Sequence, residues 1–209
     1  MVEVLLSVGV AVLTVAGIWF LRRLSFPLLT VLAGWILVVI IAAGLGLLAR
    51  GSLYPWSNIL VALLALGIGM LVGRLPTWWI VALFVAVSAA DVFSFVSGVQ
   101  SAPSPPMLAA PMLLGNLIIL LPHGHFRLGV LDIGLLAAAA YDWWQRLPGW
   151  APPCLATTAL LIPDLIALLG SKSGIPLTPF IAAVWLASLA IPTPNQRMGR
   201  SGSHPSNRR

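Results

Sequence analysis

The chain has 209 residues, of which 60% are hydrophobic and only 8% are charged, and its mean hydropathy is +1.04. This composition excludes a soluble globular domain and is typical of a multi-pass membrane protein. The net charge of +6 would suggest nucleic-acid binding in a soluble chain, but here the arginines stand singly between apolar runs or in the C-terminal tail, as topology signals do. We therefore expect contact with a lipid bilayer and none with nucleic acid.

Apolar runs near the roughly 17 to 25 residues that a spanning helix needs recur along the chain. They cover residues 4–20, 27–48, 57–73, 77–97, 128–144, 153–170 and 176–191. A loop rich in Pro, Ser and Gly occupies 98–127, and residues 193–209 have the composition of a disordered basic tail. No basic segment precedes the first run, so we expect a retained span there and not a cleaved signal peptide. The sequence predicts one all-α transmembrane domain over 1–192 with about seven spanning helices.

The distribution of arginine and lysine decides how the segment 107–121 is interpreted. This segment is apolar but short, and it contains Pro111, Gly115 and Asn116. With seven spans, eight basic residues lie on one side of the membrane and three on the other; an eighth span would divide them five against six. Cytoplasmic loops carry the excess of basic residues, so the seven-span arrangement is favoured. It places the N-terminus outside and the C-terminus in the cytoplasm, and it makes 107–121 a non-spanning element with a short strand or interfacial stretch at 116–121.

Tryptophan and glycine positions add packing predictions. Tryptophans at the ends of the expected spans indicate an interfacial belt, whereas Trp35 and Trp185 are mid-span and predict packing inside the bundle. The residues expected in the belt are Trp19, Trp56, Trp78, Trp79, Trp143, Trp144 and Trp150. Gly69 and Gly73 form a small-xxx-small pair, which predicts close approach to a neighbouring helix.

Two carboxylates are expected inside the membrane at nearly the same depth. Asp91 lies seven residues before Gly98, about 10 Å along a helix, and Asp132 lies five residues after Arg127, about 7 to 8 Å along the next one. These two spans are antiparallel and are joined on the outer side. The run that opens with Pro176, Leu177, Thr178 and Pro179 also enters from that side, and its prolines predict irregular backbone at the level of the acids.

A close carboxylate pair within a membrane indicates function, because an intramembrane charge is costly and usually lines a cavity or meets a partner. Two carboxylates in contact share a proton and titrate together. In aspartic proteases the ionised member activates a water, while the protonated member polarises the scissile carbonyl. The alternative from another class is a small proton-coupled transporter or channel that relays protons through intramembrane aspartates, although the two halves of the chain show no inverted repeat.

The order of these motifs resembles the presenilin and signal peptide peptidase family of intramembrane aspartyl proteases. That family carries its first catalytic Asp after a Tyr, its second in a Gly-x-Gly-Asp motif, and a Pro-Ala-Leu motif at the start of its last helix. Here 90–95 (ADVFSF) resembles the first motif, 129–132 (GVLD) the second and 176–179 (PLTP) the third. The likeness extends over about 77–191 and implies a short form that lacks the first two family helices.

The resemblance implies that Asp91 and Asp132 form the catalytic dyad, while Gly129, Pro176, Leu177, Thr178 and Pro179 shape the active site. It implies cleavage of a transmembrane segment of a membrane-protein or signal-peptide substrate without a metal or an organic cofactor, and a strand in the loop 98–127 that holds the substrate extended. The chain departs from the family at Ala90, Leu131 and Leu177–Thr178. A catalytically inactive, presenilin-like membrane protein is therefore a further alternative.

The remaining polar residues have simpler interpretations. Asp164 follows Pro163 and is expected to compensate backbone freed by the proline, with a substitute partner for Asp132 as the alternative. Asp142 is expected to pair with Arg146 at the cytoplasmic interface. His123 and His125 have a metal-like spacing but lack further ligands, so a solvated turn is favoured over a metal site. The single cysteine, Cys154, excludes an internal disulfide.

Overall fold

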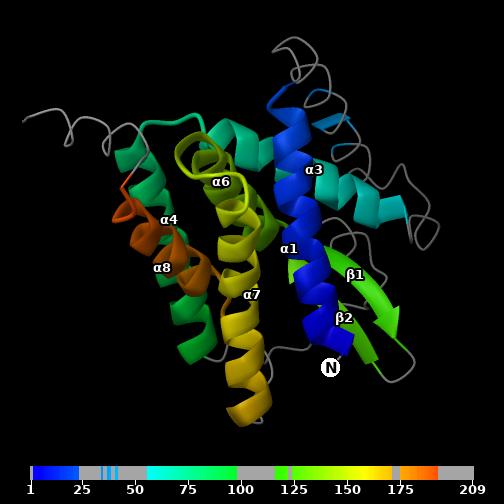
Figure 1. Cartoon of the computed structure of the whole chain (residues 1–209). Helices are drawn as coiled ribbons and strands as arrows, with labels where there is room; N and C mark the ends of the chain where they lie inside the picture. Colours follow the sequence, from blue (N-terminus) through cyan, green and yellow to red (C-terminus); the bar gives the residue numbers. More distant parts are fainter. Residues whose placement is uncertain are drawn as a thin grey trace, which may run out of the picture.

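The computed structural model describes residues 2–23, 34, 37, 38, 41, 56–97, 116–121, 124–170 and 175–192 (Figure 1). The expected second span, 27–48, falls outside the described residues except at those single positions, and the expected tail falls outside them as well. The helices of the described part are α1 (Val2–Leu21), α3 (Trp56–Val72), α4 (Thr77–Val96), α6 (Val130–Arg146), α7 (Ala151–Gly170) and α8 (Thr178–Leu189). A hairpin of β1 (Asn116–Leu121) and β2 (Gly124–Gly129) joins them.

Three of these helices, α1, α4 and α7, are long and apolar enough to cross a bilayer. They run from top to bottom in Figure 1, whereas α3 lies across the molecule. Large apolar side chains of α1, α4 and α7 point outward, among them Leu13, Phe93 and Leu169, which are all more than two-thirds exposed. Apolar faces of this extent are stable against lipid and not against water, and membrane association follows from them.

The other expected spans differ from their predicted form. The helix expected at 128–144 begins only at Val130, because β2 continues through Gly129. The run expected at 176–191 forms a helix of 12 residues, which is about 18 Å long and shorter than the hydrocarbon core of a bilayer. α3 is apolar but has only 17 residues. The sequence predicted the positions of these elements, but not the short length of α8 or the burial of α6 on all sides over residues 133–140.

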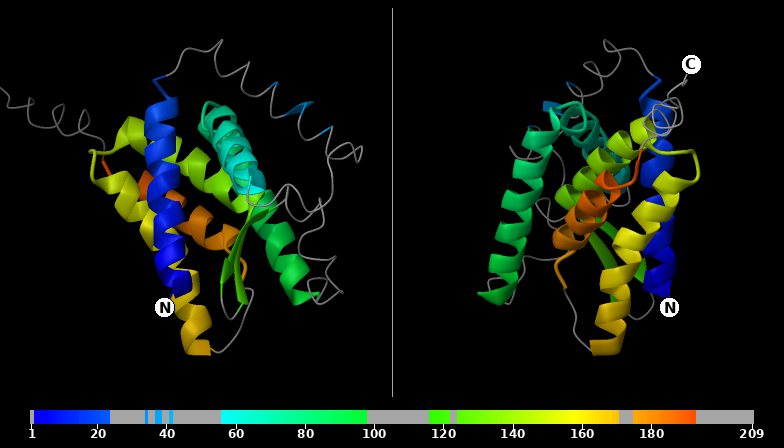
Figure 2. Two further views of the ribbon diagram at one scale, coloured as in Figure 1. Left: turned by 90° about the vertical axis from the view of Figure 1, so that its right-hand side faces the viewer. Right: turned by 60° about the vertical axis from the view of Figure 1, so that its left-hand side comes forward.

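The core is built around α6. Ala137, Ala138, Ala139 and Ala140 are all fully buried, so every side of the middle of this helix is covered by protein. Its neighbours are α1, α3, α7 and α8, and Figure 2 shows them on different sides of it. Small alanine side chains let these helices approach closely. α6 is thus the central helix, and any functional group on it is positioned by packing on all sides.

The predicted close contact of Gly69 and Gly73 is confirmed, and the neighbour is α6. A Cβ atom at Gly69 would lie 2.8 Å from the carbonyl oxygen of Gly134 and would overlap Ala137, while one at Gly73 would lie 2.8 Å from the Cβ of Tyr141. Any larger side chain would therefore push α3 away from α6.

The hairpin confirms that 116–121 is a strand and adds a small sheet to the mostly helical fold. β1 and β2 are antiparallel, with Asn116 opposite Gly129 and Ile118 opposite Arg127. The Asn58 side chain fixes the hairpin to α3: its amide nitrogen donates to the Ile118 carbonyl at 2.6 Å, and its oxygen accepts from the Ile118 amide at 2.8 Å. Both backbone groups of Ile118 therefore point away from β2.

The predicted tryptophan belt is correct in part. Trp56, Trp78 and Trp150 are exposed, as interfacial residues would be. Trp143 is fully buried, so its assignment to the belt was wrong; it packs within the core because it faces α8. Trp185 is also fully buried, which confirms its predicted packing role.

Candidate functional site

The site begins where β2 ends and α6 starts. Gly129 closes the strand in an extended conformation and caps the helix, which puts Asp132 in the first helical turn. The Gly129 backbone N–H donates to the Asp132 carboxylate, as the third residue of a helix often accepts from the capping residue. A Cβ atom at Gly129 would lie 2.8 Å from Asp132 Oδ2, so the carboxylate occupies space that only glycine leaves open. The positive end of the α6 dipole also favours a negative charge here.

Thr178 reaches the same carboxylate from the start of α8. Its Oγ1 donates to Asp132 Oδ1 at 2.9 Å, and the residue is only 2% exposed. Pro176 precedes the helix and Pro179 lies in its first turn, where the missing N–H of proline would have no helical partner anyway. Pro176 and Leu177 lie outside the helix, in irregular backbone as the sequence predicted there, and α8 begins at Thr178. Leu177 packs against two groups of buried apolar residues, the larger one around α6 and the smaller one between α3 and the hairpin.

Asp91 lies near the C-terminal end of α4 and is partly exposed. Its negative charge acts on the Asp132 carboxylate, so the two acids lie within electrostatic range of each other. In the described part of the chain, four buried side-chain oxygens have no hydrogen-bond partner: Asp91 Oδ2, Ser88 Oγ one helical turn earlier, Ser57 Oγ and Asp164 Oδ2. Buried polar atoms of this kind are rare in folded proteins and are found where a ligand or water is used.

Asp164 lies at the contact between α7 and α1. Its hydrogen-bond partner is the Ser7 side chain on α1, and Glu3 of the same helix acts on its charge. α1 and α7 pack along their lengths, which explains this pairing. Asp164 therefore faces α1, and its described interactions do not involve Asp91 or Asp132.

Leu131 stands directly before Asp132, and its position in the structure is clear. Leu131 is 57% exposed, and its side chain points away from the packed side of α6. The side chain next to Asp132 in sequence therefore does not fill the buried contact between Asp132 and Thr178.

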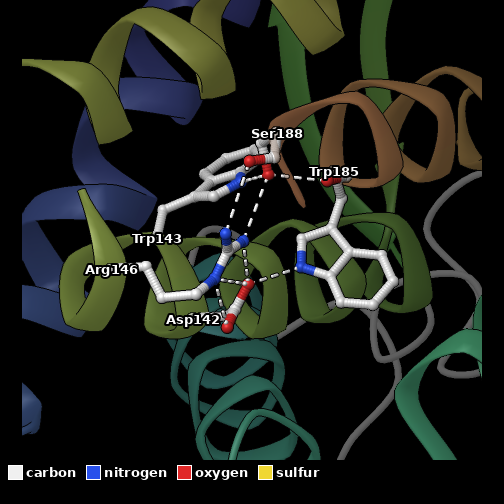
Figure 3. A network of polar contacts seen from close by, with 5 residues as sticks. All are labelled: Asp142, Trp143, Arg146, Trp185 and Ser188. Carbon is white, nitrogen blue, oxygen red and sulfur yellow. Dashed lines mark hydrogen bonds and ion pairs between the residues drawn. The ribbon is translucent and has the colours of Figure 1, made fainter. Parts of the chain in front are cut away.

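The predicted pair of Asp142 and Arg146 is present, but it belongs to a larger network that the sequence did not indicate (Figure 3). Arg146 Nε donates to both carboxylate oxygens at 2.9 and 3.0 Å. Trp185 Nε1 donates to Asp142 Oδ2 at 2.8 Å, and Trp143 Nε1 donates to Ser188 Oγ at 2.8 Å. The i,i+4 spacing was a sufficient signal for the ion pair. No sequence pattern indicated that α8 takes part in this network, because Trp185 and Ser188 lie more than 40 residues further along the chain.

A metal centre is not formed by the residues that the structure describes: no three His, Cys, Asp or Glu side chains among them gather closely enough to hold an ion. His123 and the side chain of His125 are outside this description.

No protein-family model, curated protein or solved structure matches this chain.

Proposed function

We propose that this protein is an intramembrane aspartyl protease that hydrolyses peptide bonds within transmembrane segments, with Asp91 and Asp132 as the catalytic dyad. The observation that carries the proposal is the convergence on Asp132: Thr178 donates to it from α8, and Asp91 acts on it from α4. These residues come from the three stretches that resemble the family motifs, and they lie far apart in the chain. Apolar helices around them supply the membrane setting.

In the proposed reaction, one ionised aspartate removes a proton from a water whose oxygen attacks the carbonyl carbon. The other aspartate, in its protonated form, gives its proton to the carbonyl oxygen, so that a tetrahedral diol forms. The aspartate that took the water proton then gives it to the amide nitrogen while the other aspartate removes a proton from a diol hydroxyl, so the C–N bond breaks, a carboxylic acid and an amine leave, and the dyad again shares one proton. The unpartnered Asp91 Oδ2 supports this role, because an oxygen that no protein group occupies is free to accept from water.

The outer edge of β2 is suited to hold the substrate in the extended conformation that hydrolysis requires. The Asn58 side chain hydrogen-bonds the backbone N–H and the carbonyl of Ile118, so Ile118 and Arg127 form a non-hydrogen-bonded pair. The backbone N–H and carbonyl of Arg127 therefore point away from β1. Two residues on, the Gly129 N–H on the same edge meets Asp132. A peptide added along this edge would therefore be led to the dyad.

The proposal includes the seven-span topology with the N-terminus outside and the C-terminus in the cytoplasm. In that arrangement the loop between the two catalytic helices lies outside, as in signal peptide peptidase, which favours substrates with cytoplasmic N-termini. α6 and α8 enter from the same side in this topology. Their parallel course supports it, because Thr178 meets Asp132 near the start of both helices and Ser188 meets Arg146 near the end of both.

Purified protein and a fluorogenic transmembrane peptide in detergent micelles provide the test. Wild-type protein should cut the peptide, and both Asp91→Ala and Asp132→Ala should abolish cleavage. Asp164→Ala is the matched control, since it removes an intramembrane acid that faces α1, and it should still cut. Cleavage by either dyad variant would overturn the assignment. Loss of cleavage in Asp164→Ala would favour Asp164 as the partner of Asp132, and an inert wild-type protein would favour the proton-coupled transporter or the inactive relative.

A further inference from the structure

A single side chain connects the three helices that carry the candidate site. Trp185, in the middle of α8, is fully buried and makes two directional contacts. Its Nε1 donates to Asp142 Oδ2 of α6 at 2.8 Å, and its ring stacks on Phe84 of α4 with the centroids 5.0 Å apart and the planes at 8°. Hence α4, α6 and α8 meet at one indole.

The spacing of these contacts matches the spacing of the site. Asp91 lies seven residues after Phe84 on α4, and Thr178 lies seven residues before Trp185 on α8. Seven residues are two helical turns, about 10 Å, and they return to the same face. In Figure 1, α4 runs downward and α8 crosses it obliquely in the opposite sense, so both steps lead from the Phe84–Trp185 contact toward the lower end of the view. The stack of Phe84 on Trp185 therefore places Asp91 and Thr178 on the same side of that contact.

The hydrogen bonds around Asp142 fix α8 against α6 in the same way. Asp142 lies ten residues after Asp132, and Ser188 lies ten residues after Thr178, on two parallel helices. Trp143 donates to Ser188 Oγ, and Arg146 donates to the carbonyl oxygen of Ser188 at 3.3 Å (Figure 3). A rotation or a slide of α8 would break several of these bonds at once. The far ends of both helices are thus held while Thr178 reaches Asp132 at the near ends.

We infer that Trp185 is a positioning residue of the proposed protease: it holds α4, α6 and α8 in the arrangement that brings Asp91, Asp132 and Thr178 together. The inference rests on the proposed function for its catalytic meaning. Its structural content, the control of the contact between positions 132 and 178, is independent of any activity. Displacement of a catalytic group by about 1 Å lowers rates by as much as about 10²-fold, so loss of one Trp185 contact should be measurable.

The experiment measures geometry and activity separately. The double substitution Asp132→Cys and Thr178→Cys, in a Cys154→Ser background, reports the contact through the rate at which a short thiol cross-linker joins the two positions. Trp185→Phe keeps an aromatic ring against Phe84 and removes only the donor to Asp142; Phe84→Leu removes the stack. Each should slow cross-linking about tenfold, and in the protein with its dyad intact each should lower kcat about tenfold while KM stays within about twofold. Trp150→Phe, at an exposed tryptophan, is the matched control and should change neither rate.

The outcomes distinguish the two proposals. Cross-linking at the wild-type rate in Trp185→Phe, in protein that melts at the wild-type temperature, would overturn the positioning role. Slower cross-linking together with a wild-type protein that cuts no peptide would support the positioning role and overturn the proposed function. A Trp185→Phe variant that raises KM and leaves kcat unchanged would also overturn the inference, since a misplaced dyad must slow the chemical step.

Discussion

The two ends of the α6–α8 pair each hold an aspartate, and their surroundings differ. At the C-terminal end, Asp142 accepts from Arg146 and from Trp185, and its charge is balanced by an ion pair. At the N-terminal end, Asp132 accepts from the neutral groups of Thr178 and Gly129, and its charged neighbour is another acid, Asp91. The charge of Asp142 is thus balanced by an ion pair, whereas Asp132 faces a like charge.

The difference separates a structural acid from a reactive one. A buried charge with a full set of partners is stable in one protonation state and one position, and it holds helices together. An acid whose charged neighbour is another acid is unfavourable for stability, and such acids are often found where protons are exchanged. Asp142 is therefore expected to govern stability and Asp132 to govern activity.

The largest expected effect is on catalysis at the N-terminal end. Asp132→Asn keeps an oxygen to accept from Thr178 but cannot exchange a proton, so peptide cleavage should fall by more than about 10³-fold. Its unfolding free energy should change by less than about 1 kcal/mol, measured by titration with sodium dodecyl sulfate in mixed micelles. A variant that keeps a tenth of the activity would remove the distinction between the two ends.

The next effect is on stability at the C-terminal end. Asp142→Ala leaves Arg146 without its ion pair and Trp185 without its acceptor, and it should lower the unfolding free energy by about 3 kcal/mol. The double variant Asp142→Leu with Arg146→Met removes both charges and should recover most of that loss. If the single variant were as stable as the wild type, the C-terminal network would not be structural.

A smaller effect is expected where α3 supports α6 between these ends. Gly69→Ala places a methyl group against Ala137 and the Gly134 carbonyl, and it should destabilise the fold by about 2 kcal/mol. Gly67→Ala is the control on the same helix: nothing lies within 4 Å of its new Cβ, so helix propensity alone should stabilise it by about 0.5 to 1 kcal/mol. Equal thermal shifts for both variants would contradict the close packing of α3 on α6.

The smallest effect concerns the hydroxyl on Asp132. Thr178→Val retains shape and removes the donor, so kcat should fall about tenfold, the equivalent of one hydrogen bond. Thr178→Ser retains the donor and should stay within about threefold of the wild type. The comparison of initial cleavage rates is the measurement, and identical rates for the two variants would show that the hydroxyl has no catalytic role.

The sequence by itself determined the local features of this protein. Runs of apolar residues predicted α1, α4 and α7 in nearly their observed limits, because hydrophobic length is a property of a single segment. The pair of Asp142 with Arg146 and the close packing at Gly69 also followed from spacing within one helix. A short strand at 116–121 was one of two alternatives that followed from the distribution of basic residues, and the structure has the strand.

Only the tertiary structure decided which helix faces meet. It turned Trp185 toward Asp142 and Phe84, Asp164 toward Ser7, and Asn58 toward the backbone of Ile118. It also buried Trp143, which the sequence had assigned to the membrane interface. In a protein that packs against lipid, inner and outer faces are both apolar, so hydropathy cannot indicate the rotation of a helix about its axis. That rotation determines which distant side chains touch, and the site depends on it.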